Sequence, residues 1–155
     1  MSAMKPPERG PRHDALEVFL GDWEAEGESF GGPDQDPRNP RASPTRWIST
    51  HHGSWHTGKF FLIQDERAQV DRPFDTLSIM GWDEATGRYF AHSFENHGFY
   101  RRYDVAAKGR VWTLSGDTER ARIELSEDGR RQTIAWEWRP KDVWLPLCDR
   151  VATKK

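Results

Sequence analysis

Short segments with a two-residue alternation, separated by glycine-containing turns, run through most of this chain and limit what it can fold into. In the first, residues 23–30, Glu24, Glu26 and Glu28 share one face, while small or aromatic residues occupy the other. Such alternation is typical of a β-strand with one face in water. Nine further segments follow at the regular spacing of a meander: 46–52, 59–70, 75–82, 88–96, 99–105, 111–117, 120–126, 131–139 and 144–153.

The connections between these segments are short, and those at 83–87, 96–98, 107–109 and 127–129 each contain a glycine of the kind that hairpins use at positive φ. Consecutive hairpins without long crossovers favour an up-and-down barrel over a sandwich, because closure removes exposed sheet edges. One short helix over 13–20 precedes them, with Leu16, Phe19 and Leu20 on one face and Gly21 at its end. The predicted fold is therefore an all-β, up-and-down antiparallel β-barrel of about ten strands with one short N-terminal helix.

The chain has 155 residues, which suits a single domain. Residues 1–11 are polar and proline-rich and predict a disordered leader, so we expect one barrel domain over 12–155. Residues 31–44 contain four prolines and no apolar side chain larger than alanine, which predicts a long mobile loop. This loop is either an ordinary surface excursion or a lid over the barrel mouth.

Composition excludes several classes of function. Lys and Arg (23) nearly balance Asp and Glu (25) without segregation, which argues against a dedicated nucleic-acid binder. A single cysteine, Cys148, excludes an intrachain disulfide and a multi-cysteine zinc site. No apolar run approaches the roughly 20 residues that span a bilayer, and residues 1–12 do not resemble a signal peptide. We therefore expect a cytoplasmic protein without a membrane partner.

The histidines do not have the spacing of a metal site. His51, His52 and His56 are close in sequence, but adjacent residues of a strand point to opposite faces. His92 and His97 lie on or beside another predicted strand, and no motif comparable to H-E-x-x-H occurs. We predict neither a metal nor a cofactor from these residues.

Aromatic residues dominate the candidate core. There are eight Trp and eight Phe, each of which buries roughly 150–250 Å². They either fill the barrel or border a cavity, since a ten-stranded barrel keeps an internal space unless large side chains plug it, and ligand pockets are rich in aromatic residues. The leading hypothesis is a small-molecule-binding barrel with an apolar or aromatic ligand. The candidate walls are Trp23, Trp47, Phe90, Trp112 and Trp136.

Residues 88–104 contain the polar candidates for the cavity wall. Either His92 faces inward, or Glu95 does so together with Arg101 and Tyr103 from the next strand, because the inward phase is open at this point. A histidine or carboxylate held in a semi-apolar cavity has a shifted pKa and acts as an acid or base. The second hypothesis is therefore a proton-transfer enzyme with His92 or Glu95 as base. No nucleophile elbow or phosphate loop occurs.

Several short motifs occur in a characteristic order. They are His13, Leu16, Leu20, Gly21 and Trp23; the segment 58–62; the hairpin residues 80–83 and 87–90; and, near the end of the chain, 136–137 and 144–149. Together they resemble a bacterial calycin-like family of unknown function over roughly residues 13–153. The resemblance implies a barrel with a ligand inside and brings no agreed substrate.

The resemblance also introduces two further expectations. Calycins include the lipocalins, the fatty-acid-binding proteins and the nitrobindins, which hold haem through a histidine late in the chain. Here no histidine follows His97, so a nitrobindin-like haem protein is a third hypothesis that would need His92 or His97 on another wall. A second copy of the chain is a further partner, which would give a homodimer. Exposed Trp side chains on the outer wall would indicate its interface.

Overall fold

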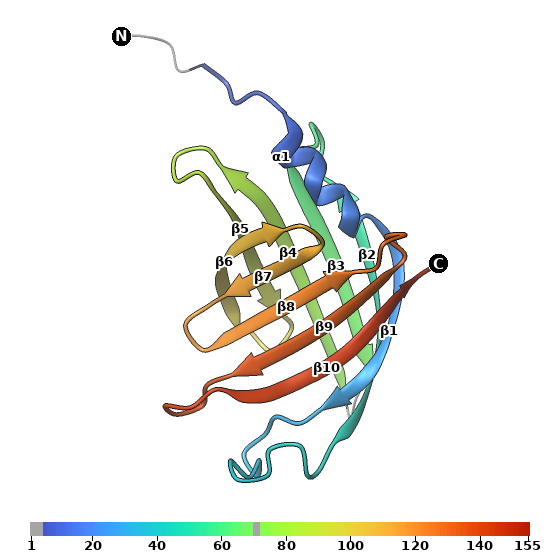
Figure 1. Ribbon diagram of the computed structural model, residues 1–155, viewed down its shortest axis with the longest axis vertical. Coiled ribbons are helices and arrows are strands. Elements are labelled where there is room, and N and C mark those ends of the chain that lie inside the picture. The colour runs from blue at the N-terminus through green and yellow to red at the C-terminus, as the bar shows by residue number, and fades with distance from the viewer. Residues whose placement is uncertain (1–4, 70–71) are drawn as a thin grey trace.

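The computed structural model describes residues 5–69 and 72–155 and forms a closed antiparallel barrel of ten strands (Figure 1). Each strand pairs with its neighbours in sequence, and β1 closes onto β10. The predicted fold class is confirmed. The strands are β1 Gly21–Ser29, β2 Thr45–Trp55, β3 Phe61–Gln69, β4 Pro73–Asp83, β5 Arg88–Glu95, β6 Tyr100–Lys108, β7 Val111–Ser115, β8 Glu119–Leu125, β9 Arg131–Trp138 and β10 Leu145–Lys154.

The N-terminal helix differs from the sequence prediction. Instead of one helix over 13–20, a four-residue α1 (Pro11–Asp14) continues into the 3₁₀ helix η1 (Ala15–Phe19). A 3₁₀ helix has three residues per turn, so Leu16 and Phe19 lie on the same face and both enter the end of the barrel. Within the described chain, neither helical segment has the length and hydropathy needed to cross a lipid bilayer.

Part of the predicted leader has defined contacts. Residues 1–4 of this leader lie outside the described residues, as does Val70, the last residue of the strand predicted over 59–70. Residues 5–10 have no regular secondary structure, but Arg9 Nε donates a hydrogen bond to the Lys59 carbonyl at 2.9 Å. Arg9 also forms an ion pair with Asp14. The residues just before α1 are thus tied to the β2–β3 connection.

The helical segment closes one end of the barrel. Leu16 and Phe19 are fully buried, and Phe19 meets Trp112 edge-to-face with ring centroids 5.1 Å apart. Trp23 completes this packed layer and is 1 % exposed. Gly53 on β2 permits the close approach of the helix, because a Cβ at that position would lie 2.1 Å from the Phe19 carbonyl oxygen. This half of the interior is solid core.

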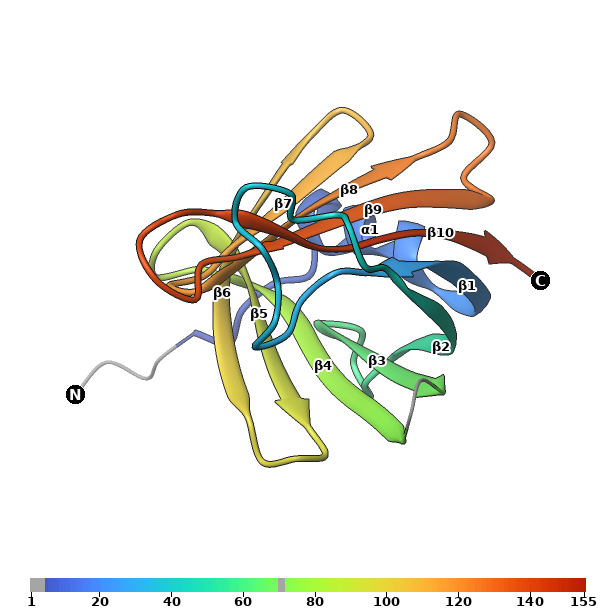
Figure 2. The same cartoon turned by 90° about the horizontal axis from the view of Figure 1, so that it is seen from below.

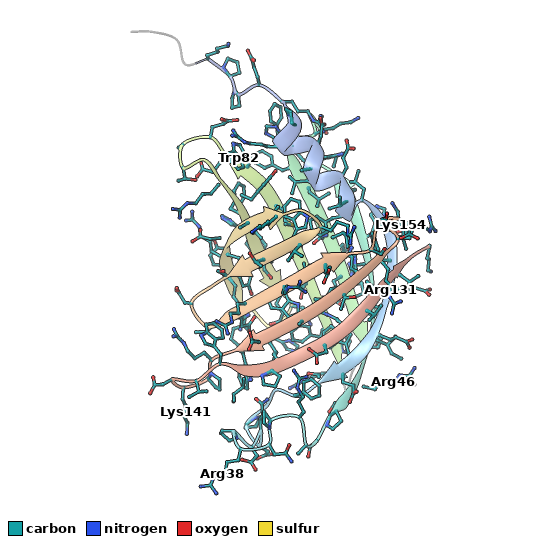
Figure 3. All side chains as sticks on the ribbon, in the orientation of Figure 1. Arg38, Arg46, Trp82, Arg131, Lys141 and Lys154 are labelled. Carbon is teal, nitrogen blue, oxygen red and sulfur yellow. The ribbon has the colours of Figure 1, made fainter. Side chains whose placement is uncertain are left out.

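The loop 31–44 lies at the opposite end, between β1 and β2 (Figures 1 and 2). Arg38 from this loop and Lys141 from the β9–β10 turn lie at that end, far from Trp82 at the helix end (Figure 3). Gln35 ties the loop to the barrel: its Nε2 donates to the Pro146 carbonyl at 2.7 Å, and its Oε1 accepts from Trp138 Nε1 at 2.7 Å. The segment predicted as a mobile loop is therefore hydrogen-bonded to β9 and β10.

Candidate functional site

Between the packed end and the loop, the barrel contains a cavity of about 510 Å³ that is partly open to solvent. The volume falls within the range of roughly 300–1,000 Å³ that is typical of small-molecule sites. Ser78 on β4 and Ser93 on β5 are cross-strand neighbours and border the cavity with small side chains. Small side chains such as these leave space between the aromatic residues, among them Trp47 and Trp136, that also border the cavity.

One wall of the cavity holds a partly buried ion pair, whose Arg150 and Glu66 side chains are 9 % and 20 % exposed. Arg150 on β10 places Nη1 3.3 and 3.2 Å from the two carboxylate oxygens of Glu66 on β3. The Arg150 guanidinium also lies over the Trp47 ring, 4.5 Å from its centroid. Ser49 Oγ accepts a hydrogen bond from Trp47 Nε1 at 2.9 Å and donates one to Glu66 at 3.3 Å. The charges are thus fixed by partners from three strands.

His51 lies next to this ion pair. Its ring stacks on Trp23 with centroids 5.8 Å apart and an interplanar angle of 16°. His51 Nδ1 is 4.0 Å from Glu66 Oε2, and within the described chain neither ring nitrogen has a hydrogen-bond partner. Burial lowers the pKa of His51, and the charge of Arg150 acts in the same direction, while that of Glu66 opposes both. The imidazole is therefore neutral at pH 7.

A second polar cluster occupies the opposite side of the barrel. Arg101 Nη2 on β6 is 3.2 Å from Glu119 Oε1 on β8, and Tyr103 donates its hydroxyl to Glu119 Oε2 at 3.1 Å. Burial is the main cause that raises the pKa of Tyr103; the charge and hydrogen bond of Glu119 raise it further, whereas Arg101 opposes them. Tyr103 therefore stays a neutral hydrogen-bond donor.

Glu95 on β5 forms the third acidic position of the wall. Its Oε1 accepts a hydrogen bond from the His97 backbone N–H at 2.7 Å and contacts His97 Nδ1. Oε2 is buried and has no partner among the described residues. The side chain of Glu95 is 4 % exposed, whereas that of His97 at the rim is 34 % exposed.

Cys148 also borders the cavity but is unreactive as a thiolate. Burial raises its pKa to about 11, with Glu66 and Asp149 contributing in the same direction and Arg150 opposing them. At pH 7 it is a neutral thiol that packs like a small hydrophobic residue. Across residues 5–69 and 72–155, no three His, Cys, Asp or Glu side chains converge on a point where they could hold a metal ion.

Comparison with known proteins adds a family to this geometry. Residues 8–143 match the family described as "Protein of unknown function (DUF1579)". The chain belongs to the DUF1579 family. The expectation of a family of unknown function is thereby confirmed.

The crystal structure of Rv2717c from M. tuberculosis is similar to this DUF1579 protein, with a TM-score of 0.68. The match covers 96 % of this chain and 99 % of that chain at 14 % sequence identity. At this identity the likeness shows a shared barrel fold and nothing about the ligand. No functionally curated protein matches the sequence significantly.

Five of the nine residues expected in the DUF1579 site border the cavity: Trp47, Glu95, Arg101, Tyr103 and Trp136. Trp23 and Trp112 lie instead in the packed layer beneath the helix, 1 % and 3 % exposed. They were expected as cavity walls, and the structure corrects that placement. The five cavity residues and these two tryptophans all point into the barrel. What distinguishes them is their depth along the barrel axis, which decides whether an inward side chain belongs to the packed core or to the cavity wall.

Phe90 and His92 point out of the barrel, which decides the inward phase left open by the sequence. On β5 the inward positions include Ala91, Ser93 and Glu95, all of which border the cavity. Outside, Phe90 contacts Phe61 and His92 (ring centroids 6.3 and 5.1 Å), and Tyr100 lies 5.9 Å from His92. Phe90 and His92 were predicted as cavity residues because aromatic side chains usually point inward. Here the outer surface is itself aromatic, so the polarity of the two faces of β5 does not indicate which one is inside.

Three charged residues of the cavity wall were missed, and so was His51. Glu66 lies in a strand with polar residues on both faces, 64–67, so alternation carries no signal there. Glu119 lies one residue before the strand predicted over 120–126, so it was not considered as a strand position, whereas β8 begins at this residue. Arg150 alternates in phase with Cys148 and Ala152, and this signal was available in the sequence.

Proposed function

We propose that this DUF1579 protein binds one small, largely apolar or aromatic molecule inside the barrel. The observation that carries the proposal is the division of the interior: one half is packed solid beneath Phe19 and Trp23, while the other encloses about 510 Å³. A barrel with only a structural role gains stability by filling its interior with apolar side chains. Aromatic rings such as Trp47 and Trp136 instead border space, as they do in ligand pockets.

The ligand proposed is electrically neutral. Two pairs of charged groups on the wall are committed to one another, Arg150 with Glu66 and Arg101 with Glu119, and Glu95 Oε1 accepts a hydrogen bond from the His97 backbone. A ligand ion entering this cavity would lose its hydration and would have to compete for these counter-ions or, as a cation, reach the buried Oε2 of Glu95, which costs several kcal/mol. A neutral ring loses little hydration and gains contact with the aromatic walls.

The two alternative hypotheses gain no support from the geometry. His92 lies outside the barrel, and the Glu95 carboxylate is held by His97, so neither is presented as a base to a bound molecule. For haem, His51 is the one histidine of the described chain that borders the cavity. Its ring is stacked on Trp23 beside Glu66, and among the described residues no second observation on the cavity wall favours iron over an organic ligand.

Placement among the calycins is part of the same proposal. Supporting it are the meander of ten strands in sequence order, the closure of β1 onto β10 and the helical segment against one end. An internal ligand site is what such barrels accommodate when their interior is not filled.

The test measures binding affinity by isothermal titration calorimetry with three ligands that share one ring system. They are 2-naphthol (neutral), 2-naphthoate (anionic) and 2-naphthylmethylammonium (cationic). We expect saturable one-to-one binding of 2-naphthol at micromolar concentration and at least tenfold weaker binding of the two ions.

Two matched variants locate the site. Ser93→Phe places a ring inside the cavity and is expected to abolish binding, whereas Thr50→Phe on the exposed face of β2 leaves it unchanged. Absence of binding by all three ligands, or equal binding by the wild type and Ser93→Phe, would contradict an internal site.

A further inference from the structure

His51 is a buried polar side chain whose hydrogen-bonding capacity is unused. The alternation of β2 turns it inward together with Trp47 and Ser49, and the residue is 7 % exposed. Both ring nitrogens are buried, and neither has a partner among the described residues. Leaving such a group unsatisfied costs about 1–3 kcal/mol, so a buried polar atom without a partner indicates a missing contact.

The surroundings distinguish the two nitrogens. Glu66 lies on the Nδ1 side, with Oε2 4.0 Å from that nitrogen, and is itself held by Ser49 and Arg150. The fixed negative charge favours the tautomer that carries its proton on Nδ1, as carboxylates do behind many functional histidines. Nε2, on the other edge of the ring, is then a lone-pair acceptor. It has essentially no accessible surface in this structure, so it meets a ligand only when the ring turns toward the cavity that His51 borders.

The charged groups around His51 keep the ring in this form. Glu66 on β3 and Arg150 on β10 are the charged groups that act on it, in opposite directions, and burial disfavours the imidazolium. Trp23 on β1 covers one ring face and contributes no charge. A neutral imidazole with a free acceptor nitrogen matches a donor that is itself neutral.

We propose that His51 Nε2 accepts a hydrogen bond from a hydroxyl group of the bound molecule, so that the ligand is a phenol or a related aromatic alcohol. This inference rests on the proposed function and deepens it. A hydroxyl supplies the neutral O–H donor, and its aromatic ring matches walls such as Trp47 and Trp136. The wall thereby selects among neutral aromatic molecules, since one without a donor leaves Nε2 unpaired.

The experiment compares 2-naphthol with its methyl ether, 2-methoxynaphthalene, which keeps the ring and lacks the donor. The wild type is expected to bind 2-naphthol about tenfold more tightly. In His51→Leu this preference should fall to about one, because no acceptor remains. His51→Gln, which restores a side-chain acceptor, should recover part of it. His92→Leu, on the outer surface, is the matched control and should keep the full preference.

A second measurement does not depend on a variant that folds. Long-range ¹H–¹⁵N spectra of the wild type report the tautomer of each histidine, and sequence-specific resonance assignment of the wild type identifies the His51 signal. We expect Nδ1–H in the free protein and a shift of the Nε2 resonance on addition of 2-naphthol but not of the ether.

The outcomes separate this inference from the proposed function. If neither naphthalene binds, the internal site itself is refuted. If both bind with equal affinity, or if the preference persists in His51→Leu, the site stands and the role of His51 is overturned. An Nε2 resonance that does not respond to bound 2-naphthol overturns it as well.

Discussion

Replacing Ser93 with Phe tests whether the barrel is hollow through the sign of a stability change. Ser93 borders the cavity beside Ser78 and faces about 510 Å³ of space. A phenylalanine ring that enters this space buries apolar surface worth about 1.5–3 kcal/mol and loses about 0.5–1 kcal/mol of rotamer entropy. We therefore expect Ser93→Phe to leave the free energy of unfolding unchanged or to raise it by up to about 2 kcal/mol.

The same ring placed in the packed half provides the control. Ala25 is 3 % exposed, pairs with Ala152 on β10 and does not border the cavity. Inserting a large side chain into a close-packed interior typically costs about 1–3 kcal/mol, and often more when the backbone must move. Ala25→Phe should therefore be destabilised, so the two variants should differ by at least about 2 kcal/mol.

Urea unfolding at pH 7, followed by far-ultraviolet circular dichroism, measures both changes. Stability changes appear as shifts of the midpoint at constant slope, which also shows that unfolding stays two-state. If Ser93→Phe loses as much stability as Ala25→Phe, the interior is filled from end to end and the reasoning from cavity to ligand fails.

Three further predictions concern the wall and the mouth. Folding lowers the pKa of His51. Below about pH 6.5 this histidine therefore binds a proton more readily in the unfolded chain than in the folded one. The free energy of unfolding should thus fall as pH drops below that value, by at most about 1.4 kcal/mol per pH unit from this residue. Urea unfolding between pH 7.5 and 5 should show a smaller decline in His51→Leu, and parallel curves would exclude the effect. Arg150→Met leaves Glu66 without its cation and should lower the free energy of unfolding by about 2–4 kcal/mol, less than for a fully buried pair because Glu66 is 20 % exposed. Adding Glu66→Gln should restore much of this stability. No recovery in the double variant would refute the coupling between the two residues. Gln35→Ala removes the hydrogen bonds to Trp138 and β10 and should speed ligand release several-fold in stopped-flow measurements; an unchanged rate would show that the loop does not control access.

Local pattern predicted the strands well. The segment 88–96 was expected as a strand and β5 spans Arg88–Glu95, while 131–139 became β9, Arg131–Trp138. Alternation and glycine turns are properties of neighbouring residues, so they can be recognised without knowledge of the fold. The helix was predicted less accurately: its second part is a 3₁₀ turn, in which Leu16 and Phe19 lie directly above one another, and not a continuation of the α-helix to residue 20.

The candidate site was harder to predict. Glu95, Arg101 and Tyr103 were considered together because they lie on neighbouring strands, and all three border the cavity. Phe90 and His92 were equally attractive, since a strand with aromatic residues on its outer face has no clear inward phase. The pairing of Arg150 with Glu66 joins residues 84 positions apart, and no local pattern encodes such a contact.

The amino-acid sequence by itself determined that this chain forms a closed meander of antiparallel strands behind a short helix. That information is local, since it consists of a two-residue period and turns with glycine at the required φ. Tertiary structure alone decided which half of the interior is filled and which charges face each other across it. Depth along a tilted barrel depends on the register of all ten strands together, so core and cavity wall become distinct only when the sheet closes.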